Sequence, residues 1–339
     1  MRRRSVAIAT LVIVLALVGM VGVWAWPSSE PSSVREQPIM EIALSGGPEL
    51  PEAEISGLAW HEDELVLLPQ YPARFGGTVF VAARRDLSAF IAGRSREPVR
   101  VRRVPLDAPG LEEALPGFDG FEALAFAGED AYFAVEARTD PEHTVGYLLR
   151  GHAPPGRLER ITIDVSHRAR LAAQTDLTNT GYEAITVDGD RVLALYEANG
   201  DINPRPRVLA FDRALELEGE LALGELEYRV TDATTVDGAG RFWVANYHWP
   251  GSPWQPGACR ITEEYGRGAS HARCNTVERL VELAIEGSRI EPTARPPILL
   301  ELIDDLHARN WEGLVRMSGG FLVMTDEHPA SILAFVAGE

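Results

Sequence analysis

Five polar residues, four of them acidic, stand in front of short apolar runs that are typical of β-strands. In each segment a turn and a second apolar run follow, and another polar residue closes the pattern 14 positions after the first. The leading residues are Ser56, Glu122, Glu183, Asp232 and Glu312. The closing residues are Gln70, Glu136, Glu197, Asn246 and Asp326. The constant spacing predicts five β-hairpins with arms of equal length.

The acidic leading residues indicate a cation site. If the hairpins surround one axis, four carboxylates meet in a narrow channel, where mutual repulsion and loss of water both raise their pKa values. A hard cation with oxygen ligands relieves this repulsion, and Ca²⁺ fits such ligands best. No Cys or paired His spacing indicates zinc. The sequence therefore predicts Ca²⁺, structural or catalytic, at this ring; the alternative is a protonated ring held by hydrogen bonds.

Candidate substrate-binding residues follow the closing positions and are expected at the same end of the hairpins. Arg138 and Asn199 come two residues after a closing acid, and Arg205 and Arg207 lie slightly further on. Arginine side chains hold phosphate through paired N–H donors, so these residues are consistent with a small phosphorylated substrate. Each of them taken alone is more often an ordinary loop residue.

Candidate catalytic residues lie at the same predicted end. Glu136 and Glu197 are closing acids that could serve as general bases, and His248 and His328 each follow a closing residue by two positions. Histidine changes its charge near neutral pH and is suited to proton transfer. No Gly-x-Ser-x-Gly, phosphate-binding Gly-rich or His-Glu-x-x-His motif is present, which disfavours a serine hydrolase.

The elements that must position these residues are blades. Each hairpin is followed by further sequence with strand character, and four strands repeated radially are typical of a β-propeller. We therefore predict an all-β, five-bladed propeller over residues 39–339. The last repeat lacks its outer strand, and residues 40–44 are expected to supply it and remove the open edge. An irregular β-sandwich is the alternative, which five equal hairpins disfavour.

The N-terminus has a different composition. Three arginines precede residues 6–26, which carry no charge and would span about 31 Å as a helix. We expect residues 1–26 to be an uncleaved membrane anchor, with a cleaved signal as the alternative, and residues 27–38 to be a flexible linker. The arginines would remain cytoplasmic and send the rest of the chain to the periplasm or outside the cell. A secreted protein is the alternative location.

The charge balance and the cysteines narrow the class further. With 32 basic and 50 acidic residues the net charge is −18, which disfavours nucleic acid as a partner. Contact with a membrane is expected through the N-terminal helix alone. In an oxidising compartment the pair Cys259 and Cys274 is expected to form a disulfide that staples a Gly- and Pro-rich insertion.

Two known propeller families share parts of this pattern. Segments 310–314 (Asn-Trp-Glu-Gly-Leu) and 325–329 (Thr-Asp-Glu-His-Pro) resemble the bacterial phytase-like proteins, also described by an esterase-like activity of phytase. Segment 182–197 is similar to them as well.

The order of the leading residues resembles the five-bladed calcium-activated nucleotidases of the apyrase type. That resemblance implies one channel calcium, hydrolysis of nucleotides at the mouth, and Ser56, Glu122, Glu183, Asp232 and Glu312 as ligands. A small hydroxyl residue is expected where Asp232 stands.

Three functions remain open. The first is a Ca²⁺-dependent hydrolase of phosphate esters or phosphoanhydrides. The second is a non-catalytic, calcium-stabilised propeller that binds a protein or glycan in the cell envelope. The third is a metal-dependent lactonase or esterase, which other propellers with acidic channels resemble.

Overall fold

The computed structural model describes residues 34–47, 53–140, 143–326 and 330–338, all within the compact unit Pro31–Glu339. These residues are mostly β-structure, and their strands fall into successive antiparallel groups. The first group is β4 (Ile55–His61), β5 (Glu64–Pro69), β6 (Thr78–Ala83) and β7 (Val99–Asp107). The second is β8 (Phe118–Ala127), β9 (Asp130–Asp140), β10 (His143–His152) and β11 (Ile161–Leu171). The third is β12 (Ala184–Asp188), β13 (Arg191–Leu195), β14 (Arg207–Asp212) and β15 (Leu217–Leu223).

The remaining strands complete the arrangement. A fourth group contains β16 (Arg229–Ala233), β17 (Arg241–His248), β18 (Val277–Glu286) and β19 (Arg289–Pro292), with β20 (Ile298–Leu300) also paired to β18. A last group contains β21 (Trp311–Met317), β22 (Gly320–Thr325), β23 (Leu333–Ala337) and β2 (Ile39–Glu41). Short helices lie between strands: η2 (Pro72–Phe75), α1 (Arg84–Ile91), α2 (Leu111–Ala114), α3 (Arg260–Tyr265) and η3 (His271–Arg273).

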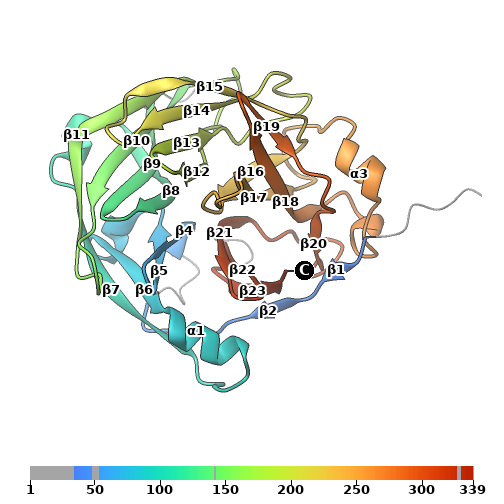
Figure 1. Cartoon of the computed structure of the whole chain (residues 1–339), viewed down its shortest axis with the longest axis horizontal. Helices are drawn as coiled ribbons and strands as arrows, with labels where there is room; N and C mark the ends of the chain where they lie inside the picture. The colour runs from blue at the N-terminus through green and yellow to red at the C-terminus, as the bar shows by residue number, and fades with distance from the viewer. Residues whose placement is uncertain (1–33, 48–52, 141–142, 327–329, 339) are drawn as a thin grey trace, which may run out of the picture. The chain divides into compact units, whose positions relative to one another are not determined.

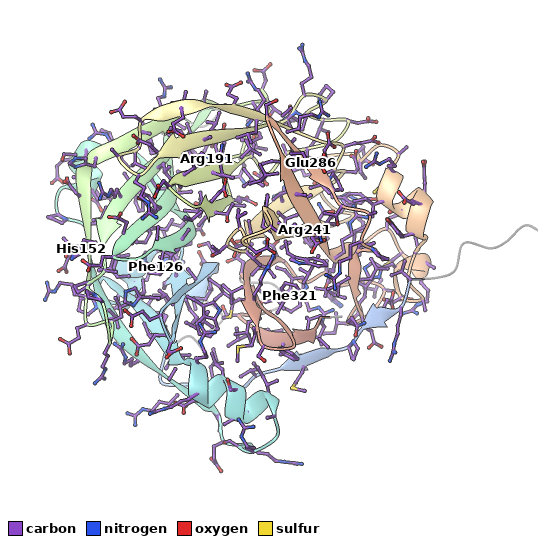
Figure 2. All side chains as sticks on the ribbon, viewed as in Figure 1. Phe126, His152, Arg191, Arg241, Glu286 and Phe321 are labelled. Carbon is purple, nitrogen blue, oxygen red and sulfur yellow. The ribbon has the colours of Figure 1, made fainter. Side chains whose placement is uncertain are left out.

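The first strands of the groups form a closed ring. β4 contacts β8, β8 contacts β12, β12 contacts β16, β16 contacts β21, and β21 returns to β4. These strands lie nearest the centre in Figure 1, and β7, β11 and β15 lie at the periphery. A central cavity of about 130 Å³ lies at one end of the ring. Every inner strand contributes to its lining, directly or through the residues that follow the strand, and Phe126 and Arg316 are among the lining residues. Phe126 is labelled in Figure 2. The curled sheets are those of a propeller-like fold.

The hydrophobic core is divided among the interfaces between neighbouring sheets. Leu58 and Leu67 of the first group pack with Val315 and Met324 of the last, and comparable clusters join each sheet to the next. The inner strands are buried almost throughout, whereas the outer strand β7 alternates between buried and exposed residues. Each sheet is therefore covered on both faces by its neighbours, and the inner ends of the hairpins are fixed by packing.

The N-terminal strand closes the last group, as predicted. β2 pairs antiparallel with β23, with Met40 opposite Phe335, and the N–H of Ile42 donates to the carbonyl of Leu333 at 2.8 Å. The strand covers Ile39–Glu41 in place of the predicted residues 40–44, because Leu44–Ser45 form β3 and pair with β7 instead. Removing the open edge of the last sheet blocks pairing with another chain.

The predicted linker is partly ordered. Glu36–Gln37 form β1, which pairs parallel with β20. The carboxylate of Glu36 accepts hydrogen bonds from the backbone N–H and hydroxyl of Ser270 at 2.8 and 2.7 Å, and it contacts His271 Nδ1 at 2.8 Å. These bonds hold residues 36 and 37 to the fourth group, so the expectation of a flexible linker is wrong for them. The predicted anchor at 1–26 lies outside the described residues, and within the part described no helix is long and apolar enough to cross a membrane.

The predicted disulfide is not formed. Both Cys259 and Cys274 are free thiols. Cys259 caps the start of α3, and its sulfur accepts a hydrogen bond from Nη2 of Arg279 at 3.3 Å. Cys274 follows η3, so the two cysteines belong to different pieces of local structure. The insertion that carries them contains two short helices, and the prediction of a stapled, irregular loop is corrected accordingly.

Candidate functional site

β-Bulges place the polar residues that begin the inner strands. An extra residue stands unpaired in β4, β8, β16 and β21, where the pairing register shifts by one. Such a bulge re-aims the side chain of the extra residue at the end of the strand. The extra residues are Ser56, Glu122, Thr231 and Glu312. Glu183 immediately precedes β12 and occupies the corresponding place.

The fourth leading residue is therefore Thr231 and not Asp232. Ser56 Oγ donates to the carbonyl of Phe121 at 2.7 Å, and Thr231 Oγ1 donates to the carbonyl of Trp311 at 2.5 Å. Phe121 and Trp311 each precede a leading glutamate, so the two hydroxyls make the same contact with the next sheet along the chain. The arm of the fourth hairpin is longer than the others, which displaces the pattern along the sequence by one residue.

Asp232 has a structural role. Its Oδ1 accepts the N–H of Ala233 at 2.7 Å and its Oδ2 accepts the N–H of Leu314 at 2.6 Å. Burial nevertheless raises the pKa of this carboxyl well above its usual range, against the effect of these N–H donors. Inner strands approach closely here: a Cβ on Gly313 would lie 2.6 Å from Cγ of Leu58. Asp232 thus links β16 to β21, and the prediction that it is a metal ligand loses its support.

Three leading glutamates form the centre of an acidic cluster. Burial, followed by the charge of Glu136, raises the pKa of Glu122 well above its usual range. Burial and then Glu197 do the same for Glu183. For Glu312 the causes are burial, then Asp326 and then Glu122. The charge of Glu122 thus raises the pKa of both Glu183 and Glu312, and the charge of Glu312 raises that of Glu183.

The closing residues extend this acidic cluster. Glu122 accepts hydrogen bonds from the amide of Gln70 at 3.2 and 3.4 Å. Glu136 is half-buried, and burial together with the charges of Glu197 and Asp119 raises its pKa to about 8. Asp326 is half-buried as well and raises the pKa of Glu312. The acidic cluster comprises Glu122, Glu136, Glu183, Glu197, Glu312 and Asp326.

The fourth hairpin contributes a tyrosine in place of the predicted asparagine. Tyr247 is buried, and its pKa is raised by burial and then by nearby carboxylates that include Glu312 and Asp326. Asn246 points elsewhere: its Nδ2 donates to the carbonyls of Glu227 and Arg229, and its Oδ1 accepts from Arg279 at 2.7 Å. The displaced register of this hairpin explains both positions.

Arg229 supplies a positive charge beside the acidic cluster. Its Nη1 donates to Oε2 of Glu197 at 3.0 Å, and the Oε1 of Glu197 accepts the N–H of Gly181 at 3.0 Å. The guanidinium lies over the ring of Trp254, 3.9 Å from the centroid. Arg229 lowers the pKa of Glu197 and Glu183, although burial keeps both values above the ordinary range. One guanidinium does not balance the acids of the cluster.

The predicted histidines and asparagine are only partly in the site. His248 is buried, stacks on Tyr228 with centroids 5.4 Å apart, and has a pKa lowered by burial and by Arg229. Burial and the charge of Arg229 thus both favour the neutral imidazole of His248. Asn199 is fully buried, and its Nδ2 donates to the carbonyls of Tyr196 and Glu197 at 2.9 Å. Asn199 thus holds the backbone at Glu197 and has no exposed surface to offer a substrate. His328 lies outside the described residues.

Of the predicted arginines, Arg138 alone acts on the acidic cluster, where its charge lowers the pKa of Glu136. Arg138 pairs with Asp119 at 2.8 Å and with Oδ1 of Asn179 at 2.9 Å. Arg205 and Arg207 line a separate cavity, of which Arg138 is not a lining residue. Arg207 also pairs with Glu220 at 3.1 Å. These arginines do not converge, because Arg138 belongs to β9 of the second sheet, whereas Arg205 precedes β14 of the third sheet and Arg207 begins it.

The donor set of the cluster suits a hard cation in its chemistry. Glutamate carboxylates and hydroxyl oxygens are the ligands that Ca²⁺ prefers. Oε2 of Glu183 is buried and has no hydrogen-bond partner, which is unfavourable for a carboxylate unless a cation or proton meets it. As the side chains are placed, no three His, Cys, Asp or Glu residues in the described ranges converge closely enough for one ion. Gln70, Asn310 and Arg229 hold several of the acids instead.

Two features of the site escape sequence reasoning. The repeat does not identify Thr231, because the fourth hairpin is longer than the others. A hydroxyl residue directly before Asp232, where a hydroxyl residue is expected, could have indicated the shift. Arg229 falls two residues before Thr231 and has no counterpart in the other hairpins, so no repeat points to it. Its role follows from its contacts with Glu197 and Trp254 alone.

Comparisons with known proteins show a weak structural similarity to several solved structures. No family model and no curated protein matches the chain. Among solved structures, glutaminyl cyclase of Myxococcus xanthus shares 12% identity, with a TM-score of 0.39 over 90% of this chain and 100% of that one. The GH43_1 enzyme of Xanthomonas citri shares 12% identity, with a TM-score of 0.47 over 88% and 91%. A glucose dehydrogenase shares 13%, with a TM-score of 0.43 over 87% and 99%. We derive no activity from similarity at this level.

Proposed function

We propose that residues 39–339 form a five-bladed β-propeller, exported from the cytoplasm, that binds Ca²⁺ at the acidic cluster and hydrolyses phosphate esters or phosphoanhydrides there. The observation that supports this most is the excess of acids in the cluster, where burial and mutual repulsion raise the pKa of each leading glutamate. Arg229 and, at Glu136, Arg138 leave that repulsion largely unrelieved, which favours a bound cation.

The ion would be held by Glu122, Glu183 and Glu312 together with the hydroxyl oxygens of Ser56 and Thr231. These hydroxyls donate their protons to backbone carbonyls, so their lone pairs remain available. When bound, Ca²⁺ would neutralise phosphate oxygens and orient a water molecule. When the ion binds, the amide of Gln70 would either give up its hydrogen bonds to Glu122 or keep one of them and orient the other carboxylate oxygen of Glu122.

The chain's own residues would provide proton transfer and a second positive charge. Glu136 is half-buried with a pKa raised to about 8, so the carboxylate that forms as the pH approaches 8 is a stronger base than an ordinary glutamate and can take a proton from water. Arg229 uses one of its N–H donors on Glu197 and is fixed by Trp254, which leaves other donors for a phosphate oxygen. Glu197 would position Arg229.

A non-catalytic function has specific support as well. The arginines predicted to hold phosphate pair with acids or line another cavity. An ion at the cluster would then stabilise the ring of inner strands, and another surface would bind a protein or glycan of the envelope. Both proposals include calcium binding, and they differ in whether the protein hydrolyses a phosphate compound.

The test uses the purified full-length protein with ATP, ADP and phytate, in calcium or in EDTA. The hydrolase proposal predicts phosphate release that requires calcium and falls by about 100-fold or more in Glu183→Gln, the loss typical of removing a group that stabilises the transition state. Glu218→Gln is the matched control, because Glu218 is exposed on β15. Calcium binding without release of phosphate from any of the three would favour the non-catalytic function.

A further inference from the structure

A cavity of about 710 Å³ lies where the third and fourth sheets meet, formed by the residues before β14, the end of β15 and the start of β19. Three arginines line it, Arg205, Arg207 and Arg289, and no Asp or Glu is among its lining residues. This is unusual in a chain with 50 acidic and 32 basic residues. A local concentration of positive charge attracts small anions, even in a protein whose net charge is negative.

The arginines are available to a ligand. Arg207 pairs with Glu220 at 3.1 Å and Arg289 with Glu291 at 2.5 Å, and the side chains of both arginines are about half exposed. Exposed ion pairs contribute little to stability, so a ligand can compete for these guanidinium groups. Within the described ranges, the guanidinium of Arg205 has no hydrogen-bond partner, and the residue is exposed.

The wall of the cavity is rigid. Oε1 of Gln174 accepts the N–H of Arg207 at 2.8 Å, and its Nε2 donates to the carbonyl of Arg207 at 2.7 Å. Asn203 donates from Nδ2 to the carbonyl of Ala198 at 2.9 Å. Prolines at 204 and 206 restrict the backbone on both sides of Arg205. A site that is already ordered loses little conformational entropy when a ligand binds.

We propose that this cavity, the arginine cavity, binds a small organic molecule that carries two or more phosphate groups. Guanidinium groups match the geometry of phosphate through paired N–H donors, and three of them fit a ligand with several negative charges. The volume lies in the range of small-molecule sites and exceeds that of a phosphate group, and Ala222 and Leu223 offer an apolar contact to the remainder of the ligand. None of the lining residues belongs to the acidic cluster, so binding does not require calcium.

Isothermal titration of the full-length protein with pyrophosphate, in EDTA and at low salt, tests the arginine cavity. We expect saturable binding that weakens as salt increases, and that weakens by about tenfold or more in Arg205→Gln, because a charge-assisted hydrogen bond is lost. Arg94→Gln removes the same charge from the exposed end of α1 and is expected to bind as the wild type does. Glu183→Gln is also expected to bind unchanged, which separates this site from the acidic cluster.

Several outcomes would overturn the proposal. Equal binding by the wild type and Arg205→Gln would remove the arginine cavity as the site, and equal losses in Arg205→Gln and Arg94→Gln would indicate a general charge effect. Binding that appears only with calcium would assign pyrophosphate to the acidic cluster. Citrate is the comparison ligand, and tighter binding of citrate than of pyrophosphate would contradict the choice of phosphate.

Discussion

At the scale of single residues, a bulge decides which of two neighbours faces the acidic cluster. Thr231 is the extra residue in β16 and turns its hydroxyl toward Trp311, whereas Asp232 returns to the regular pairing and accepts backbone N–H groups of Ala233 and Leu314. A one-residue shift in a strand exchanges the faces of all side chains that follow. The two positions therefore have different functions although they are adjacent.

Substitutions at these neighbours are expected to have opposite effects. Thr231→Val removes an oxygen ligand and is expected to weaken calcium binding by about tenfold, with a modest change in stability. Asp232→Asn replaces an acceptor of a backbone N–H by an amide donor and is expected to lower the free energy of unfolding by about 1–3 kcal/mol, with calcium affinity unchanged. Calcium titration and urea unfolding of both variants measure these effects. A loss of calcium affinity in Asp232→Asn alone would restore Asp232 as the ligand.

Most residues of the acidic cluster can be predicted from the sequence, but the residues that surround the cluster cannot. Glu122, Glu183 and Glu312 are found by the repeat because the hairpins that carry them have equal arms. The fourth hairpin is longer, so the repeat predicts Asp232 and Asn246 at the positions that Thr231 and Tyr247 occupy in the structure. Arg138, Arg205 and Arg207 follow the hairpins in loops without a repeat, and their directions depend on contacts with Asp119, Gln174 and Glu220 that no local pattern indicates.

At the scale of elements, the N-terminal segment connects sheets that are distant in sequence. β1 pairs with β20, β2 with β23 and β3 with β7. The last sheet is therefore completed by hydrogen bonds between the beginning and the end of the chain. The addition of β2 was predictable because the last repeat lacks a strand. The parallel pairings of β1 and β3 involve only two residues each and leave no periodic signal.

A proline in this segment is expected to weaken the closure. The N–H of Ile42 donates to the carbonyl of Leu333 at 2.8 Å, and its side chain is buried. Ile42→Pro removes the donor and part of the apolar contact, so we expect a loss of about 3 kcal/mol or more in the free energy of unfolding. Ile42→Val keeps the donor and is expected to lose about 0.5–1.5 kcal/mol. Equal stability of the two variants in thermal or urea unfolding would show that this closure contributes little.

At the scale of the whole molecule, stability and pH are connected through the acidic cluster. A carboxyl whose pKa is raised by folding favours the folded state at low pH, because the folded protein holds the proton more tightly than the unfolded chain. That stabilisation is complete below the ordinary carboxyl pKa of 4.5 and is lost as the pH rises through the folded value, which is about 8 for Glu136. The glutamates of the ring add to the effect in the same direction.

The calcium-free protein is therefore expected to melt at a lower temperature at pH 8 than at pH 5.5. A difference of at least about 2 °C corresponds to roughly 1 kcal/mol in a domain of this size. Calcium is expected to reduce the difference, because the ion replaces the protons as the partner of the carboxylates. Thermal melts at both pH values, in EDTA and in calcium, measure it. A melting temperature that rises from pH 5.5 to pH 8 in EDTA would contradict the raised pKa values.

We propose that the ring of leading residues holds a calcium ion, and equilibrium dialysis of the full-length protein followed by metal analysis measures this binding. We expect one bound calcium per chain for the wild type and for Glu218→Gln. We expect none for the combined variant Glu122→Gln, Glu183→Gln and Glu312→Gln, which should fold in EDTA because neutral amides remove the repulsion. Calcium that remains bound in the folded triple variant, or a wild type that binds none, would rule out a calcium site at this ring.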